Sequence, residues 1–362
     1  MKRIYGIDVL KMMAMLMVVM LHIMERGGVF AVCAENARSL NFACFKVFYS
    51  ACRCAVDCFV LATGYVMCRH TFKYSRIFKL WAEVVFYAVG MLLVARCFFP
   101  SVAIDYKTVF KAVMPVLFDT YWFFTDYVGL FFCMPFLNRL LATLDRKSAW
   151  QMVAVGFVVW SVFASIPNGD IFNLNEGYSL VWFIYLYLLA GTISLHGVPI
   201  PVTPVRTMTL FVGSAMMTTL FCSLGDHVSR RWGVFGGRWG SYASPFVLLE
   251  AVSLLLICMR IEVRRVALQR AIAFFAPSVF SVYILHSNPI FRVMFQWNGR
   301  FAFLGHCALP LTLGGIAGCA ALIFAVCIGI DVARRVFVNR ILRAIVRSSP
   351  GGALDMTVGV LI

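Results

Sequence analysis

The sequence is poor in charged residues. Asp, Glu, Lys and Arg make up only 13% of its 362 residues, whereas 62% are hydrophobic and the mean hydropathy is +0.87. Soluble domains carry about a quarter charged residues, which cover the surface in contact with water. So little charge excludes a globule in water, and it predicts an all-α, polytopic bundle of helices embedded in a lipid bilayer.

Several signatures of soluble enzymes and of metal sites are also missing. The sequence contains no G-x-S-x-G motif, no P-loop and no Rossmann glycine pattern. None of its six histidines begins the H-x-x-x-x-D pattern of glycerolipid acyltransferases. The thirteen cysteines form no C-x-x-C pair and no Cys/His cluster with zinc-ligand spacing. We therefore expect no metal site, and thiols that are mostly small buried apolar groups.

Long apolar runs are what the sequence does contain. A membrane-spanning helix needs about 20 mainly apolar residues. Ten such runs are found, at 4–24, 45–68, 80–99, 120–141, 149–167, 178–196, 207–224, 241–259, 272–296 and 309–331. Because the connections between them are short, we expect one transmembrane domain over residues 1–345 and a short cytoplasmic tail over residues 346–362.

The net charge of +16 is distributed in short basic clusters between the apolar runs. With the N-terminus in the cytoplasm, the internal segments carry about twice as many basic residues as the external ones, as the positive-inside rule requires. This distribution predicts cytoplasmic N- and C-termini in a multi-pass protein of the cytoplasmic (inner) membrane. Contacts with membrane lipids also account for the net positive charge, so nucleic acid is not an expected partner.

The first apolar run carries ionisable groups on one face. Lys11 and His22 are eleven residues apart, which is within about 20° of three full helical turns and about 16 Å along the axis. Asp8 lies three residues before Lys11 and is expected to pair with it. Ionisable groups at membrane depth mark functional sites, and histidine exchanges protons at neutral pH. The alternative is that His22 lies at the headgroup boundary and that the Asp8–Lys11 pair is structural.

Other runs also contain charged or titratable residues. Arg53 and Asp57 are four residues apart in the second run and are expected to pair across one helical turn. Several further runs contribute such groups, and together they predict a shared polar cavity, although each alone could be a structural contact; they are Glu83, Asp126, Glu250, His286 and Arg292.

A basic segment follows the second run. Arg69, Lys73, Arg76 and Lys79 are spaced three or four residues apart, which predicts a single basic face if the segment is helical. The face could orient the chain and attract anionic lipids. It could also bind a phosphate-bearing cytoplasmic molecule, because arginine grips phosphate oxygens with two hydrogen bonds.

The order of motifs resembles the acyltransferase-3 family of membrane-bound bacterial acyltransferases, which O-acetylate glycans. Lys11 and His22 look like the opening Arg/Lys-x10-His motif of that family. The segment VDCFVLATGYVM is similar to its V-D-x-F-F-x-x-S-G-Y/F block, with Thr63 in place of the usual serine. Arg76 and Lys79 in SRIFKLW are similar to the R-x-x-R element that follows.

Three later segments extend the resemblance. YWFFTDYVGLFFCMPFLNRL is similar to the family's segment that begins with Trp-Phe and ends at a proline. VWFIYLYLLAGTISL matches its W-F-x-x-x-Y-x-x-G span, and VYILH matches its Y-L-x-H block, which ends here at His286. Each motif alone is weak, but six in the same order are specific and cover residues 3 to 290.

The resemblance implies transfer of an acyl group, expected to be acetyl from acetyl-CoA, to a hydroxyl of a cell-surface polysaccharide or lipid-linked sugar. His22 would be the general base, supported by Lys11 and Asp8. The phosphates of coenzyme A would contact Arg76 and Lys79 first, with Lys73 and Arg69 beside them. The substrate cavity would be lined by Arg53, Asp57, Trp122, Asp126 and His286.

Two other functions fit parts of the sequence. A transporter or exporter of a glycan or glycolipid precursor would use the buried charges to line a substrate path. A membrane-bound O-acyltransferase of the other large type would use His286 or His306 as its base. The oligomeric state is not indicated by the sequence.

Overall fold

The computed structural model describes residues 3–232 and 237–348, and in these ranges it contains helices and no strands. The all-α fold predicted from the composition is thereby confirmed. The α-helices are α1 (Tyr5–Met24), α2 (Val29–Ala34), α3 (Leu40–Arg53), α4 (Ala55–Met67), α5 (Ser75–Phe98), α6 (Tyr106–Val113), α7 (Trp122–Thr143), α8 (Arg146–Gly156), α9 (Leu180–His196), α10 (Pro204–Trp232), α11 (Pro245–Cys258), α12 (Val266–Phe275), α13 (Val279–Ser287), α14 (Pro289–Met294) and α15 (Leu309–Ser348). Shorter helical segments are η1 (Phe157–Phe163), η2 (Asn175–Gly177), η3 (Ala276–Ser278) and η4 (Ala302–His306).

Each of the ten apolar runs falls on one helix or on consecutive helices. Five helical segments are long and apolar enough to cross a bilayer: Tyr5–Met24, Ser75–Phe98, Pro204–Ser229, Val266–Ser287 and Leu309–Val338. Two shorter apolar helices, α9 and α11, lie among them. The protein is therefore a multi-pass membrane protein, whereas ten spans and two cytoplasmic termini stay predictions. The predicted tail at 346–362 lies mostly outside the described residues.

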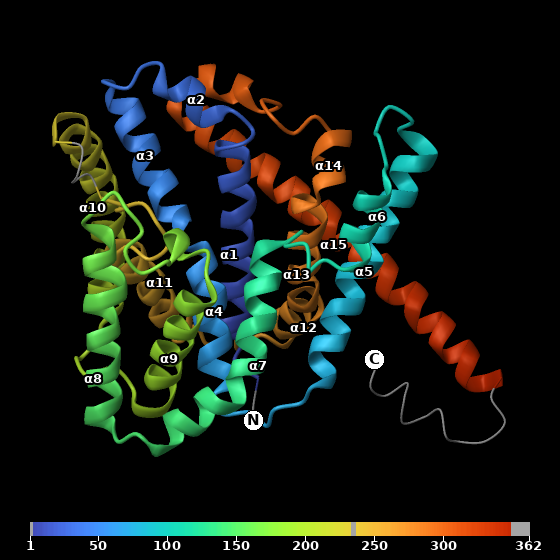
Figure 1. Cartoon of the computed structure of the whole chain (residues 1–362), viewed down its shortest axis with the longest axis horizontal. Coiled ribbons are helices and arrows are strands. Elements are labelled where there is room, and N and C mark those ends of the chain that lie inside the picture. Colours follow the sequence, from blue (N-terminus) through green and yellow to red (C-terminus); the bar gives the residue numbers. More distant parts are fainter. Residues whose placement is uncertain (1–2, 233–236, 349–362) are drawn as a thin grey trace.

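Helix α1 runs through the middle of the bundle. Figure 1 shows α8, α9, α10 and α11 on one side of it and α5, α6, α13 and α14 on the other, whereas α15 crosses it obliquely. Leu10, Val19 and Ile23 of α1 are fully buried. By contrast, Leu93 of α5 and Leu322 of α15 are 62% and 66% exposed, as expected of side chains that face lipid tails. Helix α1 is therefore largely enclosed by protein, whereas α5 and α15 lie at the outside of the bundle.

The second apolar run is a broken helix. α3 ends at Arg53, Cys54 lies in a turn, and α4 begins at Ala55. The fifth run is also irregular, because α8 continues into the π-helical segment η1. In the ninth run, the short segment η3 separates α12 from α13. Each break changes the direction in which the side chains after it point. The breaks therefore affect which residues can meet in the site described below.

Polar side chains cap the N-termini of several helices. Asp105 accepts hydrogen bonds from the backbone N–H of Thr108 (2.8 Å) and from its hydroxyl (2.6 Å), and Asp145 accepts one from the N–H of Ser148 (3.0 Å). These bonds favour the charged carboxylate and lower the pKa of both aspartates. They stabilise the starts of α6 and α8 by satisfying free N–H groups.

Helices α4 and α9 cross closely at Gly64. A Cβ atom at this position would lie 2.7 Å from the carbonyl oxygen of Tyr187 and 2.9 Å from its Cα. Both neighbours are backbone atoms, so they could make room only if one helix moved. The glycine of the VDCFVLATGYVM block is therefore explained by helix packing.

We expect Gly64→Ala to destabilise the fold, because overpacking of this kind costs about 1–3 kcal/mol. The melting temperature of the purified protein in detergent should fall. Gly90→Ala is the matched control, since Gly90 lies on α5 with nothing within 4 Å of a Cβ atom. Equal melting temperatures for the two variants would contradict the close crossing.

Candidate functional site

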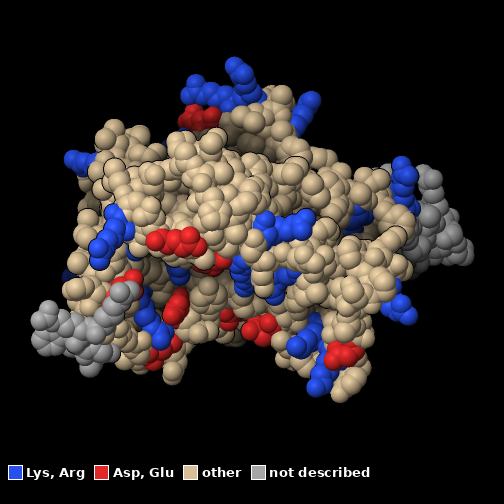
Figure 2. All heavy atoms as spheres, turned by 90° about the horizontal axis from the view of Figure 1, so that it is seen from above, with Lys and Arg blue, Asp and Glu red and all other residues tan. Residues whose placement is uncertain are grey.

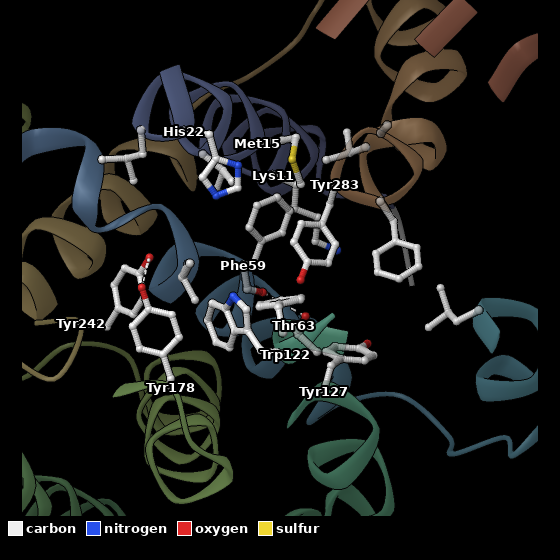
Figure 3. Close-up of a pocket in the computed structure, with 18 of the residues that line it drawn as sticks. Lys11, Met15, His22, Phe59, Thr63, Trp122, Tyr127, Tyr178, Tyr242 and Tyr283 are labelled. Atoms are coloured by element: carbon white, nitrogen blue, oxygen red, sulfur yellow. Dashed lines mark hydrogen bonds between the residues drawn. The ribbon is translucent and has the colours of Figure 1, made fainter. Parts of the chain in front are cut away.

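A cavity of about 320 Å³ lies beside α1. Its walls come from α1, α4, α7, η3 and α13 and from Leu80 of α5, together with Tyr178 and Tyr242, which precede α9 and α11. Figure 3 shows the imidazole of His22 projecting into this space, with Trp122, Tyr178 and Tyr242 on one side and Tyr283 on another. Lys11 lines the same cavity, so the prediction that Lys11 and His22 share one face is confirmed.

His22 is held at the end of α1 by contacts from the C-terminal part of the chain. Its backbone carbonyl accepts hydrogen bonds from the N–H of Gly27 (3.0 Å) and from the indole N–H of Trp297 (3.2 Å). Its ring Nδ1 lies 3.1 Å from Nε2 of His286, with the ring centroids 5.0 Å apart. His286 is 1% exposed and lies behind His22, not among the residues that line the cavity.

The surroundings of the two rings determine where the protons lie. Nδ1 of His286 is 2.6 Å from the backbone carbonyl oxygen of Val282, which can only accept a hydrogen bond. In the neutral ring, His286 therefore carries its proton on Nδ1 and offers a lone pair at Nε2. His22 donates its own Nδ1 proton to that lone pair, and its Nε2 is left unprotonated. This tautomer makes His22 a hydrogen-bond acceptor, and so a candidate base, on the side of the ring away from His286.

A second pocket, of about 490 Å³, lies near the N-terminal end of α1. Lys11 lines both this pocket and the cavity that contains His22. The other polar residues of the second pocket include three basic or titratable groups that can contact an anion; they are Arg3, Arg69 and His70. In the predicted orientation, this pocket faces the cytoplasm. The two spaces therefore share Lys11 on α1, and His22 lies toward the far end of the first of them.

The predicted pair of Asp8 and Lys11 is wrong. The carboxylate of Asp8 forms an ion pair with Arg3, with Nε and Oδ2 2.6 Å apart. Arg3 precedes the helix and folds back to reach Asp8, which lies in the first turn of α1. Asp8 remains in the wall of the second pocket, where it is the neighbour of Lys11 and not its partner.

The predicted pair of Arg53 and Asp57 is also wrong, because the helix breaks between them at Cys54. Arg53 donates to the hydroxyl of Tyr49 (2.6 Å) and lies 3.8 Å from the carboxylate of Glu25. Asp57 is fully buried and accepts a hydrogen bond from the indole N–H of Trp182 (3.1 Å). Neither residue is part of the cavity wall.

The basic segment after α4 does not form one helical face. Arg69 lies in the turn after α4, Lys73 lies in an irregular stretch, and only Arg76 and Lys79 are on α5. Arg69 lines the second pocket, where its Nε donates to the hydroxyl of Ser194 (2.9 Å). Arg76 donates to the sulfur of Met67 (3.1 Å) and, like Lys73 and Lys79, lies outside that pocket wall.

The remaining predicted residues are divided among separate places. Trp122 lines the cavity, whereas Asp126, one turn further along α7, does not. Glu83 lies 3.5 Å from Arg334, and Glu250 accepts a hydrogen bond from Thr218 (2.7 Å). The expected gathering of all buried charges in one cavity is therefore wrong. His306 is exposed on η4.

Sequence reasoning missed several residues that line the cavity: Glu25, Tyr178, Tyr242 and Tyr283. Glu25 follows His22 by three residues, and Tyr283 is the tyrosine of the VYILH segment, so both had a signal in the sequence. Tyr178 and Tyr242 lie in irregular segments before α9 and α11, where no periodicity marks an inward-facing side chain. In the described ranges, no three His, Cys, Asp or Glu side chains gather in a way that could hold a metal ion.

Comparison with known proteins gives one match. A family model described as an acyltransferase domain matches residues 4–330, nearly the whole chain. No curated protein and no solved structure matches the chain.

The arrangement of the two histidines predicts an uncommon tautomer for His22. Neutral imidazole in water prefers the proton on Nε2, whereas the contact with His286 requires it on Nδ1 of His22. We expect ¹⁵N spectra of the histidine-labelled protein to show the Nδ1–H form, assigned by its loss in His22→Ala. In His286→Phe the signal should move toward the Nε2–H form. His306→Ala is the control, and an Nε2–H signal for His22 in the unmodified protein would contradict the assignment.

Proposed function

The chain belongs to the acyltransferase-3 family and is a membrane acyltransferase, and we propose that it transfers an acyl group, expected to be acetyl, from acyl-coenzyme A to a carbohydrate hydroxyl. The acceptor is a cell-surface polysaccharide or a lipid-linked sugar, and the membrane is the cytoplasmic membrane. One observation carries this proposal: His22 lines a cavity whose wall shares Lys11 with the second pocket, which is basic and lies at the other end of α1.

The donor enters from the basic pocket. Arg3, Arg69 and His70 offer charged or polar N–H groups that suit the phosphates of coenzyme A. Lys11 and His22 are about 16 Å apart along the helix axis, a distance that the extended pantetheine arm can cover. The thioester can therefore reach His22 while the nucleotide part stays at the cytoplasmic side. Lys11 lies along this path and supplies positive charge next to the thioester-bearing arm.

The reaction needs a base because a sugar hydroxyl is a weak nucleophile. Nε2 of His22 accepts the hydroxyl proton as the oxygen attacks the thioester carbonyl carbon. The carbon–sulfur bond then breaks, the ester remains on the sugar, and the proton on Nε2 passes to the thiolate of coenzyme A. His286 accepts the Nδ1–H hydrogen bond throughout and so stabilises the positive charge that His22 carries between the two proton transfers.

We expect His22→Ala to lower kcat for acetyl transfer by about 10²–10⁴-fold, the usual contribution of general-base catalysis. The assay follows label from acetyl-CoA into crude surface glycan, with purified protein in detergent or liposomes. His306→Ala, at an exposed position on η4, serves as the matched variant and should retain activity. Undiminished transfer by His22→Ala would refute the base, and acetyl-CoA left unconsumed by the unmodified protein would favour an exporter.

Two variants locate the donor phosphates. Arg69→Gln should raise KM for acetyl-CoA about tenfold, because it removes charge-assisted hydrogen bonds to phosphate. Arg76→Gln should change KM little, since its guanidinium faces Met67 outside the basic pocket. The opposite result would place the nucleotide on the start of α5, as the R-x-x-R resemblance implies.

A further inference from the structure

Three aromatic rings from separate parts of the chain form one side of the cavity. Trp122 begins α7, Tyr178 follows η2, and Tyr242 precedes α11; we call these three residues the aromatic wall. The ring of Trp122 lies 4.3 Å from that of Tyr178 and 6.1 Å from that of Tyr242, centroid to centroid, and it is nearly parallel to Tyr242 (16°). Figure 3 shows the wall across the cavity from His22. It therefore faces the atom at which the acceptor must react.

A polar edge lies beside the aromatic wall. Glu25 lines the cavity one turn after His22, and its carboxylate accepts a hydrogen bond from the hydroxyl of Tyr49 (2.6 Å). Arg53 donates to the same hydroxyl, and its guanidinium lies 5.9 Å from the ring centroid of Tyr242. The carboxylate is thus held in position while 44% of the Glu25 side chain remains exposed. It can accept hydrogen bonds from the hydroxyls of a ligand.

The aromatic wall and the neighbouring Glu25 carboxylate together favour some ligands over others. A pyranose ring has a face of C–H bonds that packs on aromatic rings and a rim of hydroxyls that donate to a carboxylate. An acyl chain would cover the exposed part of the Glu25 carboxylate and displace water from it without offering a hydrogen-bond donor, which is costly. A quaternary ammonium also suits aromatic rings, but here Arg53 lies over Tyr242 and Arg26 lines the same cavity. Arg53 lies near the carboxylate of Glu25. Lys11 and Arg26, however, both line the cavity, so its positive charge disfavours a cation and leaves a neutral sugar as the best fit.

We infer that the aromatic wall is the acceptor subsite and that it stacks against the C–H face of a neutral pyranose ring. Glu25 accepts hydrogen bonds from hydroxyls on the rim of that ring, and another hydroxyl is directed toward His22. This assignment deepens the proposed function and rests on it for the reaction, whereas binding of the sugar itself can be measured without catalysis.

The test is saturation-transfer difference NMR on the purified full chain in detergent, with methyl β-D-glucopyranoside as the probe and choline as the competing cation. We expect saturation of the axial protons H1, H3 and H5, which lie together on one C–H face of the ring. Trp122→Leu should weaken binding about tenfold, as loss of a stacked aromatic ring predicts. Trp81→Leu is the matched control, because this indole is 40% exposed on α5, away from the cavity.

Glu25→Gln is a second variant, for the case in which Trp122→Leu does not fold; it should weaken binding while leaving the axial-proton pattern unchanged. Saturation of choline in place of the sugar would overturn the inference. So would equal binding by Trp122→Leu and Trp81→Leu, or no saturation of the glucoside and of the corresponding galactoside and N-acetylglucosaminide. The proposed function fails separately: sugar binding with no acetyl transfer would leave the subsite in place and remove the reaction.

Discussion

The hydrogen bond between the rings of His22 and His286 is the interaction on which the site depends. It joins α1 to α13, 264 residues apart in the sequence. A buried polar group without a partner is costly, and each ring here satisfies one nitrogen of the other. Because the carbonyl of Val282 fixes the proton of His286, the same contact fixes the proton of His22. One buried contact thus serves both the packing of the bundle and the acid–base state of the candidate base.

A second group of buried charges holds the helix that carries His286. Asp331 of α15 is fully buried, accepts a hydrogen bond from Tyr87 (2.6 Å) and forms an ion pair with Arg334 (2.7 Å). Arg334 also lies 3.5 Å from Glu83, which accepts a hydrogen bond from Ser281 of α13. The cluster therefore connects α5, α13 and α15 and restrains the rotation of α13. Charges that do not face the cavity still determine the direction in which His286 points.

The sequence predicted the helices well and the ion pairs poorly. Apolar runs reveal where helices form for two reasons. A helix needs about 20 apolar residues to cross the hydrocarbon layer. Within lipid, a spanning segment must also satisfy its own backbone hydrogen bonds, as a helix does. The shared face of Lys11 and His22 follows from the geometry of one unbroken helix. The partner of each charged residue does not follow from helix geometry. The break at Cys54 turns Arg53 away from Asp57. The segment before α1 folds back and brings Arg3 to Asp8. Tyr178 and Tyr242 lie in irregular segments, where no period indicates which side chains face inward.

The error at Asp8 has a consequence for the chemistry. A direct ion pair between Asp8 and Lys11 would have weakened the attraction of an anionic donor to the point that the two spaces share. With Asp8 bound to Arg3, the charge of Lys11 faces the two spaces that it lines. A lysine that lies near a carboxylate but forms no ion pair with it is costly at membrane depth, so a ligand or water in these spaces would stabilise Lys11. The acyl-coenzyme A that we propose as the donor would bring its polar arm and its thioester past Lys11 and would end at His22.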